Sequence, residues 1–513
     1  MKFKTIILLT SILVFSACED FLEVDPANER VISDIKDIQG ALGGYLNEMK
    51  NPHSNNQGWI ASDAFYKDKR FFQDLNTQRL FLFQSDELDS EFYPTHGMVY
   101  SDNETEYING VDWKLTPPQE RIWEESYLMI GFFNSLLDEL GKLDVSQEEI
   151  EDVKGEILLQ RSWCIFKLLQ FFTPYDNNDL GIPLNLDADN ITGYNQGRRK
   201  QTEVYELIIR DINEVLTFET EPNEAYHIFY NKAIAHAILA QIYMYKAEST
   251  AGVAEDWSLA REHAKNAMAG KSLATTVEEL HDIFHVQSGY TTRDHPHALL
   301  GMYWKQFKYF IHPWFWGMPE NRIFGAPEQF AGIKVTPELF ALYEDGDLRK
   351  APVSMPPPIT FGYISTYGEI TKKYHGVMNG SQSWENCILF RVADMHLIVA
   401  ESYAREGNNG DALSWLQEFK DARNATYNGG DVLTEILNER RKEFVAEHEM
   451  RWIDMKRNRV EYSRNFNHPK DGPVTYMIKG NDFRYTFKIP EDAELSYNKD
   501  IEQNPGWDSV SEQ

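Results

Sequence analysis

Two pairs of alanine-rich amphipathic segments constrain the fold of this chain more than any other feature of its sequence. Residues 230–247 (YNKAIAHAILAQIYMYKA) and 257–269 make the first pair, and residues 393–424 contain the second, with a turn at Gly407 to Gly410. Apolar residues recur three and four places apart, which is the spacing of one helix face. Small residues, which let two helices approach closely, stand at matching places of the first pair, namely Ala233, Ala237, Ala240, Ala260, Ala264 and Ala267.

Helix, short turn and helix with small residues at the seam is the pattern of tetratricopeptide repeats. Further helices are predicted at 122–140, from a capping box at Ser146 and Glu149 to Phe172, at 202–218 and at 432 to about 448. Pro174 ends the second of these. No regular period runs along the chain, so we expect repeat-like helical pairs and not a regular solenoid. The predicted fold class is all-α dominated.

Two long stretches break the helical pattern. Residues 51–118 are rich in Asn, Gly, Asp and aromatic residues, and residues 285–385 contain HVQSGYTTRDHPH, an aromatic cluster and PVSMPPPIT. We call them insert 51–118 and insert 285–385. Long loop-like inserts on a rigid scaffold are where binding residues usually lie.

Composition limits the classes of partner. The chain has 513 residues with 42% hydrophobic and 13% aromatic residues, which excludes global disorder. Its net charge is −30, and no Lys/Arg block is long enough to form a phosphate-binding face. Because affinity for nucleic acid depends on neutralising phosphates, we expect no nucleic-acid partner.

The N-terminus has the pattern of an export signal. Lys2 and Lys4 precede an apolar run at 5–15, and two small residues stand directly before Cys18. The run is shorter than the roughly 20 apolar residues that a membrane-spanning helix needs. The arrangement resembles a bacterial lipobox, although Phe15 replaces the usual leucine; the alternative is an ordinary cleaved signal with an incidental cysteine. We therefore expect lipidation of Cys18 and membrane anchoring by acyl chains.

The two other cysteines predict little. Cys164 lies in an apolar helix face, where a thiol packs as a small hydrophobe. A disulfide between Cys164 and Cys387 is the alternative, with weak support from two distant cysteines.

Aromatic residues in the inserts are candidates for ligand contacts, because flat apolar rings can stack on a ligand while neighbouring polar groups form hydrogen bonds with it. The alternative is that about half of these rings belong to the core. The densest set in insert 285–385 is Tyr303, Trp304, Tyr309, Trp314 and Trp316, with Lys305, Gln306 or His312 as polar neighbours. The second set, in insert 51–118, is Trp59, Asp63, Phe65 and Tyr66, with Tyr93, Tyr100 and Trp113 behind them.

A group of charged residues near the end of the chain resembles a catalytic cluster at first sight. It consists of Arg440, Arg441, Glu443, Glu447 and Arg451. Because Glu443 and Glu447, and Glu447 and Arg451, are four places apart, we interpret the group as an ion-pair network along one helix face.

No catalytic motif is complete in the sequence. His448 and Glu449 begin a zinc-protease motif, but Trp452 stands where its second histidine belongs. Carboxylate pairs at glycosidase separation prove nothing among 80 acidic residues. We expect no cofactor and no catalytic metal. The one ion we consider is a structural calcium at Asp63 or at the turn with Asp345 and Asp347.

Several short blocks recur along the chain in a recognisable order. The first is CEDFLEVDP at 18–26. The further blocks are WEESY at 123–127 with Asn134, GEILLQR at 155–161, GIPL at 181–184, VTPELFALY at 335–343 with Asp347 and Arg349, FRVAD at 390–394 to Ala400 and Glu401, NERRKEF at 438–444, Glu447 to Arg457, Ile489 and Pro490, Asn498, and QNPGW at 503–507. These blocks span nearly the whole mature chain and resemble those of the SusD/RagB-like family of outer-membrane nutrient-binding lipoproteins, whose opening motif is C-x-D-F-L-D/E-x-x-P.

The resemblance implies an architecture and a role. It implies a SusD-like fold with tetratricopeptide-like helical pairs and irregular, loop-rich ligand-binding inserts. The expected organisation is a lipoprotein signal peptide at 1–17, a lipidated tether at 18–30 and a single SusD-like domain at 31–513. The implied role is non-catalytic capture of an oligosaccharide and its delivery to a SusC-like TonB-dependent transporter, by a lipoprotein of the outer membrane that faces the cell surface.

Two other functions stay open at this point. The first is a peptide or glycopeptide receptor with the same architecture, as in RagB-like members, which the inserts do not exclude. An exported glycosidase is disfavoured because no catalytic block is discernible.

Overall fold

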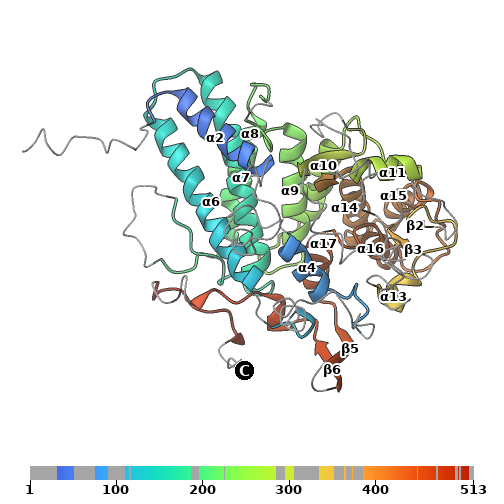
Figure 1. The fold of residues 1–513 in the computed structure, drawn as a ribbon. Coiled ribbons are helices and arrows are strands. Elements are labelled where there is room, and N and C mark those ends of the chain that lie inside the picture. The colour runs from blue at the N-terminus through green and yellow to red at the C-terminus, as the bar shows by residue number, and fades with distance from the viewer. Residues whose placement is uncertain are drawn as a thin grey trace, which may run out of the picture.

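The computed structural model places helices along most of the chain (Figure 1). The residues that it describes are 32–50, 75–90, 110–114, 117–186, 196–223, 226–284, 295–304, 334–351, 363–365, 373, 385–447, 449–468, 472–491, 495 and 498–507. All statements on structure below concern these residues. The mostly helical content confirms the predicted fold class.

Helix α7 (Gln147–Phe172) is the centre of the scaffold. It begins at the predicted capping box, where the Ser146 and Glu149 side chains each accept the other's backbone N–H, and it ends before Pro174. Every residue from Gly155 to Phe172 is buried. Helix α7 is covered by helices on several sides, namely α2 (Ile35–Lys50), α6 (Pro117–Lys142), α8 (Gln201–Leu216) and α9 (Lys232–Lys246).

The two predicted helical pairs are present and lie side by side (Figure 1). The first consists of α9 and α10 (Asp256–Ala267), and the second of α14 (Val392–Arg405) and α15 (Asn409–Asp421). Helix α10 packs on α14, although more than a hundred residues separate the pairs in the sequence. The alanine seam of the first pair is fully buried at Ala237, Ala240, Ala260 and Ala264. The two helical pairs therefore pack directly on each other through α10 and α14.

The helix predicted for 432–448 is shorter than expected. Helix α16 (Val432–Glu443) ends at Glu443, and a new helix, α17 (Met450–Arg457), begins six residues after Phe444. Ala446, in the turn between them, has a φ of 56°, which a continuous helix does not allow. The prediction of one helix through His448 was wrong.

Both inserts contain regular structure that the sequence did not reveal. Helix α4 (Leu75–Gln84) lies in insert 51–118. Insert 285–385 contains β1 (Ala298–Trp304), the short helix α13 (Pro337–Phe340), and the parallel pair β2 (Lys350–Ala351) and β3 (Ile364–Ser365). Helix α11 (Val277–Phe284) precedes that insert.

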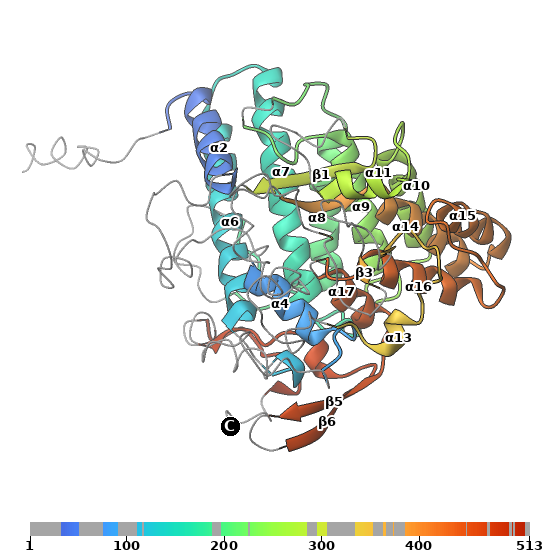
Figure 2. The ribbon, with the colours of Figure 1, turned by 45° about the vertical axis from the view of Figure 1, so that its right-hand side comes forward.

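The described residues also form three small two-stranded sheets. Strand β1 pairs antiparallel with β4 (Glu385–Arg391), which runs directly into α14. Strands β5 (Tyr462–His468) and β6 (Gly472–Ile478) form a hairpin that projects below α17 and α13 in Figure 2. A 3-10 turn, η4 (Phe483–Tyr485), follows the hairpin. None of the described helices combines the length and the apolar character that crossing a bilayer requires.

Candidate functional site

Most residues predicted to contact a ligand lie outside the described residues. This holds for Trp59, Asp63, Tyr66, Tyr309, Trp314 and Trp316, and also for the predicted lipidation site, Cys18. Tyr303 and Trp304 have a described backbone at the end of β1. The assignment of these residues to a ligand site therefore stays a prediction, and the described residues show where their segments are attached.

The β1–β4 ladder brings together the two chain ends that flank residues 305–384, which include most of the predicted aromatic cluster. In this ladder Tyr303 is opposite Asn386, and Trp304 is opposite Glu385. The chain thus leaves this ladder after Trp304 and re-enters it at Glu385. Since β4 leads into α14, the aromatic cluster starts at a point that the helical scaffold positions.

The two inserts contact each other at residues 85–90 and 334–336, which we call the junction. The Thr336 N–H donates to the Glu87 carbonyl at 2.8 Å, and the Asp89 N–H donates to the Lys334 carbonyl at 2.9 Å. Between them, Leu88 and Val335 form an antiparallel bridge. Backbone hydrogen bonds therefore tie insert 51–118 to insert 285–385.

Buried charges fix the junction to the turn between α16 and α17. The Asp86 carboxylate accepts two hydrogen bonds from Arg451, both at 2.6 Å, and lies 3.1 Å from the Arg441 guanidinium. Burial raises the pKa of Asp86, but Arg451 and Arg441 outweigh it and bring the pKa to about 2. Glu87 accepts the Ala446 N–H at 3.2 Å, and burial raises the pKa of this carboxyl group to about 7. Sequence reasoning missed Asp86 and Glu87, because their partners are about 360 residues away.

Trp113, a member of the second candidate set, belongs to the core. Its indole N–H donates to the Gln84 carbonyl at 2.8 Å, and the Arg464 guanidinium lies 4.1 Å from its ring centre. Arg464 also donates to the Phe83 and Gln84 carbonyls at 2.6 and 3.1 Å. With only 1% of its surface exposed, Trp113 cannot stack on a sugar. Trp113 is therefore one of the candidate rings that belong to the core, which was the alternative to ligand binding.

The charged cluster near the C-terminus is a buried network that joins several elements. Glu443 pairs with Arg349, Arg391 and Arg423, whereas Glu447 pairs with Arg391 and with Lys373, which lies outside any described helix or strand. The predicted structural role is thus supported by the geometry. The predicted helix-face arrangement was wrong, because Glu443 ends α16 and Glu447 lies in the turn.

Cys164 lies on α7, where the sequence left two alternatives open, a packed free thiol or a disulfide with Cys387. Cys164 is a buried free thiol, so the alternative of a disulfide with Cys387 is wrong. Burial raises the pKa of the Cys164 thiol to about 12.

The acidic turn was the predicted place for a structural calcium ion. Asp347 pairs with Arg349 at 2.7 Å, and Asp345 pairs with Lys350 at 2.7 Å. The two carboxylates therefore pair with separate cations. Among the described residues, no group of three or more His, Cys, Asp or Glu side chains is arranged to hold a metal ion.

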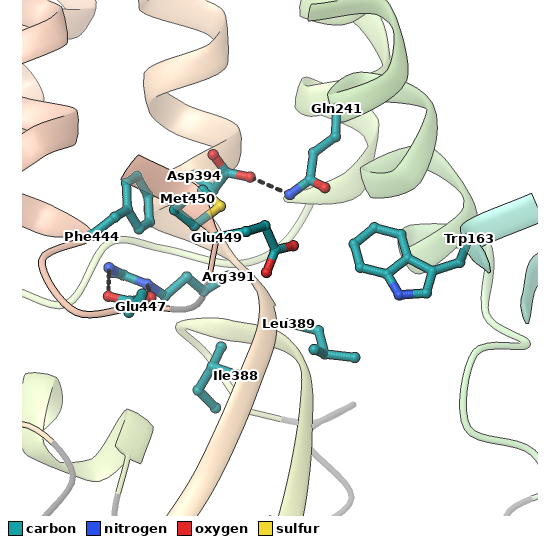
Figure 3. Close-up of a pocket in the computed structure, with 10 residues that line it drawn as sticks. All are labelled: Trp163, Gln241, Ile388, Leu389, Arg391, Asp394, Phe444, Glu447, Glu449 and Met450. Carbon is teal, nitrogen blue, oxygen red and sulfur yellow. Dashed lines mark hydrogen bonds and ion pairs between the residues drawn. The ribbon is translucent and has the colours of Figure 1, made fainter. Parts of the chain in front are cut away.

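A small cavity lies between α7, α9, β4 and the α16–α17 turn (Figure 3). Trp163 forms one side and Arg391, paired with Glu447, the other, while the Gln241 amide donates to Asp394 at 2.8 Å above it. Its volume of about 20 Å³ suits a single water molecule. Ligand pockets measure about 300–1,000 Å³, so this cavity is no sugar site.

Comparison with protein-family models matched two parts of the chain. Residues 20–244 match the SusD-like model described as "Starch-binding associating with outer membrane", and residues 358–507 match the SusD_RagB model, described as the SusD family. Together these matches cover most of the sequence. Among functionally curated proteins, none matched the chain.

Solved structures of the SusD superfamily share the fold. A SusD superfamily protein from Bacteroides thetaiotaomicron VPI-5482 is 18% identical, with a TM-score of 0.64 over 92% of this chain and 100% of that one. A SusD-like carbohydrate binding protein from Bacteroides vulgatus ATCC 8482 is 19% identical, with a TM-score of 0.63 over 92% and 98%. A third, from Parabacteroides distasonis ATCC 8503, is 17% identical, with a TM-score of 0.64 over 92% and 100%. The chain therefore belongs to the SusD/RagB-like family.

Proposed function

We propose that the chain is a non-catalytic receptor at the cell surface, which captures oligosaccharides and delivers them to a SusC-like TonB-dependent transporter. The family is described as starch-binding and associated with the outer membrane, and one structural neighbour is named a carbohydrate binding protein. Acylation of Cys18 would hold the receptor at the membrane without a spanning helix.

The junction is the observation that carries this proposal. It ties the insert with Trp59, Asp63 and Tyr66 to the insert with the aromatic cluster at 303–316. Buried ion pairs of Asp86 hold the junction to the scaffold. A receptor that stacks sugars on rings from two segments needs such a common attachment, because the segments must keep their relative position without the ligand.

The proposal is tested by ligand binding to a variant that loses three rings of the aromatic cluster. Replacing Trp304, Trp314 and Trp316 together by alanine should weaken glycan binding while the melting temperature stays nearly unchanged. The matched control is Trp163→Ala, because Trp163 is 2% exposed and its loss should cost about 3–5 kcal/mol of stability. A triple variant that melts as early as the control would assign these rings to the core and contradict the proposed site.

The choice between sugar and peptide is made by screening the protein on glycan and peptide arrays. Binding to peptides alone would favour the second candidate, a peptide or glycopeptide receptor of the same architecture, which the match to the SusD_RagB model leaves open. Hydrolysis of a bound glycan by pure protein, lost on one carboxylate substitution, would refute a non-catalytic role. Co-purification of the membrane-bound protein with a TonB-dependent barrel tests the transporter partner.

A further inference from the structure

Two histidines face each other across the seam of the first helical pair. His236 lies on α9 and His263 on α10, and their Nδ1 atoms are 2.8 Å apart. The His263 ring also stacks on Tyr243 of α9, with ring centres 5.6 Å apart and planes within 6°. The buried alanine seam holds these two helices close together, as Figure 1 shows for α9 and α10. The histidine pair therefore sits on a rigid part of the scaffold and not on a loop.

Binding of one metal ion by both Nδ1 atoms would break the hydrogen bond between the rings and leave the proton of each neutral ring on Nε2. A 2.8 Å contact between two ring nitrogens requires one N–H donor and one unprotonated acceptor. Burial lowers the pKa of both rings, and together with the neighbouring His236 it brings the pKa of His263 to about 4. Glu262 and Lys232 are the charged groups that act on His236, in opposite directions. Near pH 7 both rings are therefore neutral, and a metal ion does not have to displace the proton of an imidazolium ring.

The separation of the two nitrogens fits neighbouring ligands of one metal ion. An imidazole nitrogen lies about 2.0–2.1 Å from Zn²⁺, and similar bonds at about 90° place two nitrogens roughly 2.9 Å apart. Such right angles are those of tetragonal Cu²⁺, which also binds most tightly among the divalent first-row metals. From the observed 2.8 Å contact, metal binding requires the rings to rotate toward a common point and the donor ring to shift its proton from Nδ1 to Nε2.

We propose that His236 and His263 form a two-histidine site for a divalent transition metal ion, with Cu²⁺ bound most tightly. Because the described residues contain no cluster of three or more ligating side chains, solvent completes the coordination. Open positions make such a site exchangeable, unlike a closed structural site. The net charge of −30 raises the local concentration of cations around the protein.

The test is a titration of the full-length, untagged protein with CuCl₂ at pH 7.5, followed by electron paramagnetic resonance. The first equivalent of Cu²⁺ bound to the unaltered protein should show coupling to two imidazole nitrogens. His236→Gln and His263→Gln should each lower the affinity for the first Cu²⁺ by more than about tenfold. Removing a residue that only supports a metal ligand already costs about 10–100-fold in affinity, and these variants remove a ligand itself.

The matched control is His281→Gln, which alters a partly buried histidine of α11 outside the pair and should leave the first equivalent unchanged. A first equivalent that couples to one or no imidazole in the unaltered protein would overturn the proposal, and this readout does not depend on the folding of a variant. Loss of the first equivalent in His281→Gln alone would overturn it too.

Discussion

The substitution Glu443→Gln tests whether buried ion pairs stabilise the end of α16. The Glu443 carboxylate lies 2.8 Å from Arg423 and 3.1 Å from Arg349, and it also pairs with Arg391. None of these side chains is more than 2% exposed. Burial alone would raise the pKa of Glu443, but the three guanidinium groups hold it well below its ordinary value. The carboxylate is therefore charged at pH 7, and glutamine removes that charge at nearly constant volume.

The expected loss follows from the charges that remain. Removing one partner of a buried pair costs about 3–5 kcal/mol, because the other charge stays buried without compensation. The entropy of unfolding is about 2.1 cal/mol/K per residue, or roughly 1 kcal/mol per degree for a body of roughly 480 residues. Glu443→Gln should therefore lower the melting temperature by about 3–5 °C.

Differential scanning calorimetry at pH 7 measures this change, and Glu435→Gln on the same helix is the matched control. The Glu435 side chain is 27% exposed and lies 3.2 Å from Lys420, so its loss should cost less than about 1 kcal/mol and about 1 °C. A drop of less than 1 °C for Glu443→Gln, or equal drops for the two variants, would refute the reasoning that burial makes the network stabilising.

Three further predictions concern packing, pH and anchoring. Gly155→Ala should destabilise the protein by about 1–3 kcal/mol in thermal unfolding, because the new Cβ would lie 2.5 Å from the Tyr230 ring. Gly131→Ala should stabilise the protein by about 0.5–1 kcal/mol, because Gly131 is exposed on α6 and has open space around it. Equal signs for the two changes would contradict the packing. The Glu87 carboxyl has its pKa raised by burial from 4.5 to about 7, so its contribution to stability is present below pH 4.5 and lost as the pH rises through 7. Glu87→Gln should thus gain up to roughly 3 kcal/mol over the unaltered protein at pH 8 and little at pH 5, and a pH-independent difference in melting temperature would argue against this. Cys18→Ala should move the protein from the membrane to the soluble fraction on centrifugation, and continued membrane association would speak against lipidation at Cys18.

Local sequence patterns predicted the helical scaffold well. The capping box at Ser146 and Glu149, the stop before Pro174 and the alanine seam each depend on residues that are close in the chain or on one helix face. Such features act through helix hydrogen bonds and side-chain spacing, which any single segment carries by itself. The family blocks likewise run along the chain in order, so membership could be recognised before any contact was known.

The candidate site could be predicted only as a region. The aromatic residues of the inserts were visible, but their attachment was not, because the junction consists of backbone hydrogen bonds between residues 87–89 and 334–336. Backbone pairing between distant segments has little dependence on side-chain identity. Trp113 shows the same limit, since its neighbours Gln84 and Arg464 come from two distant parts of the chain.

The sequence by itself therefore determined the scaffold helices α6 to α10, the pair α14 and α15, and the family of this protein. Only the tertiary structure decided how its charges pair. Glu443, Glu447 and Arg451 stand four places apart, as on one helix, yet the chain turns after Glu443. Glu447 pairs there with Arg391, and Arg451 pairs with Asp86, which is 365 residues away. The pairing of a buried charge depends on the counterion that the fold brings to it, because a buried charge left without its partner costs about 3–5 kcal/mol.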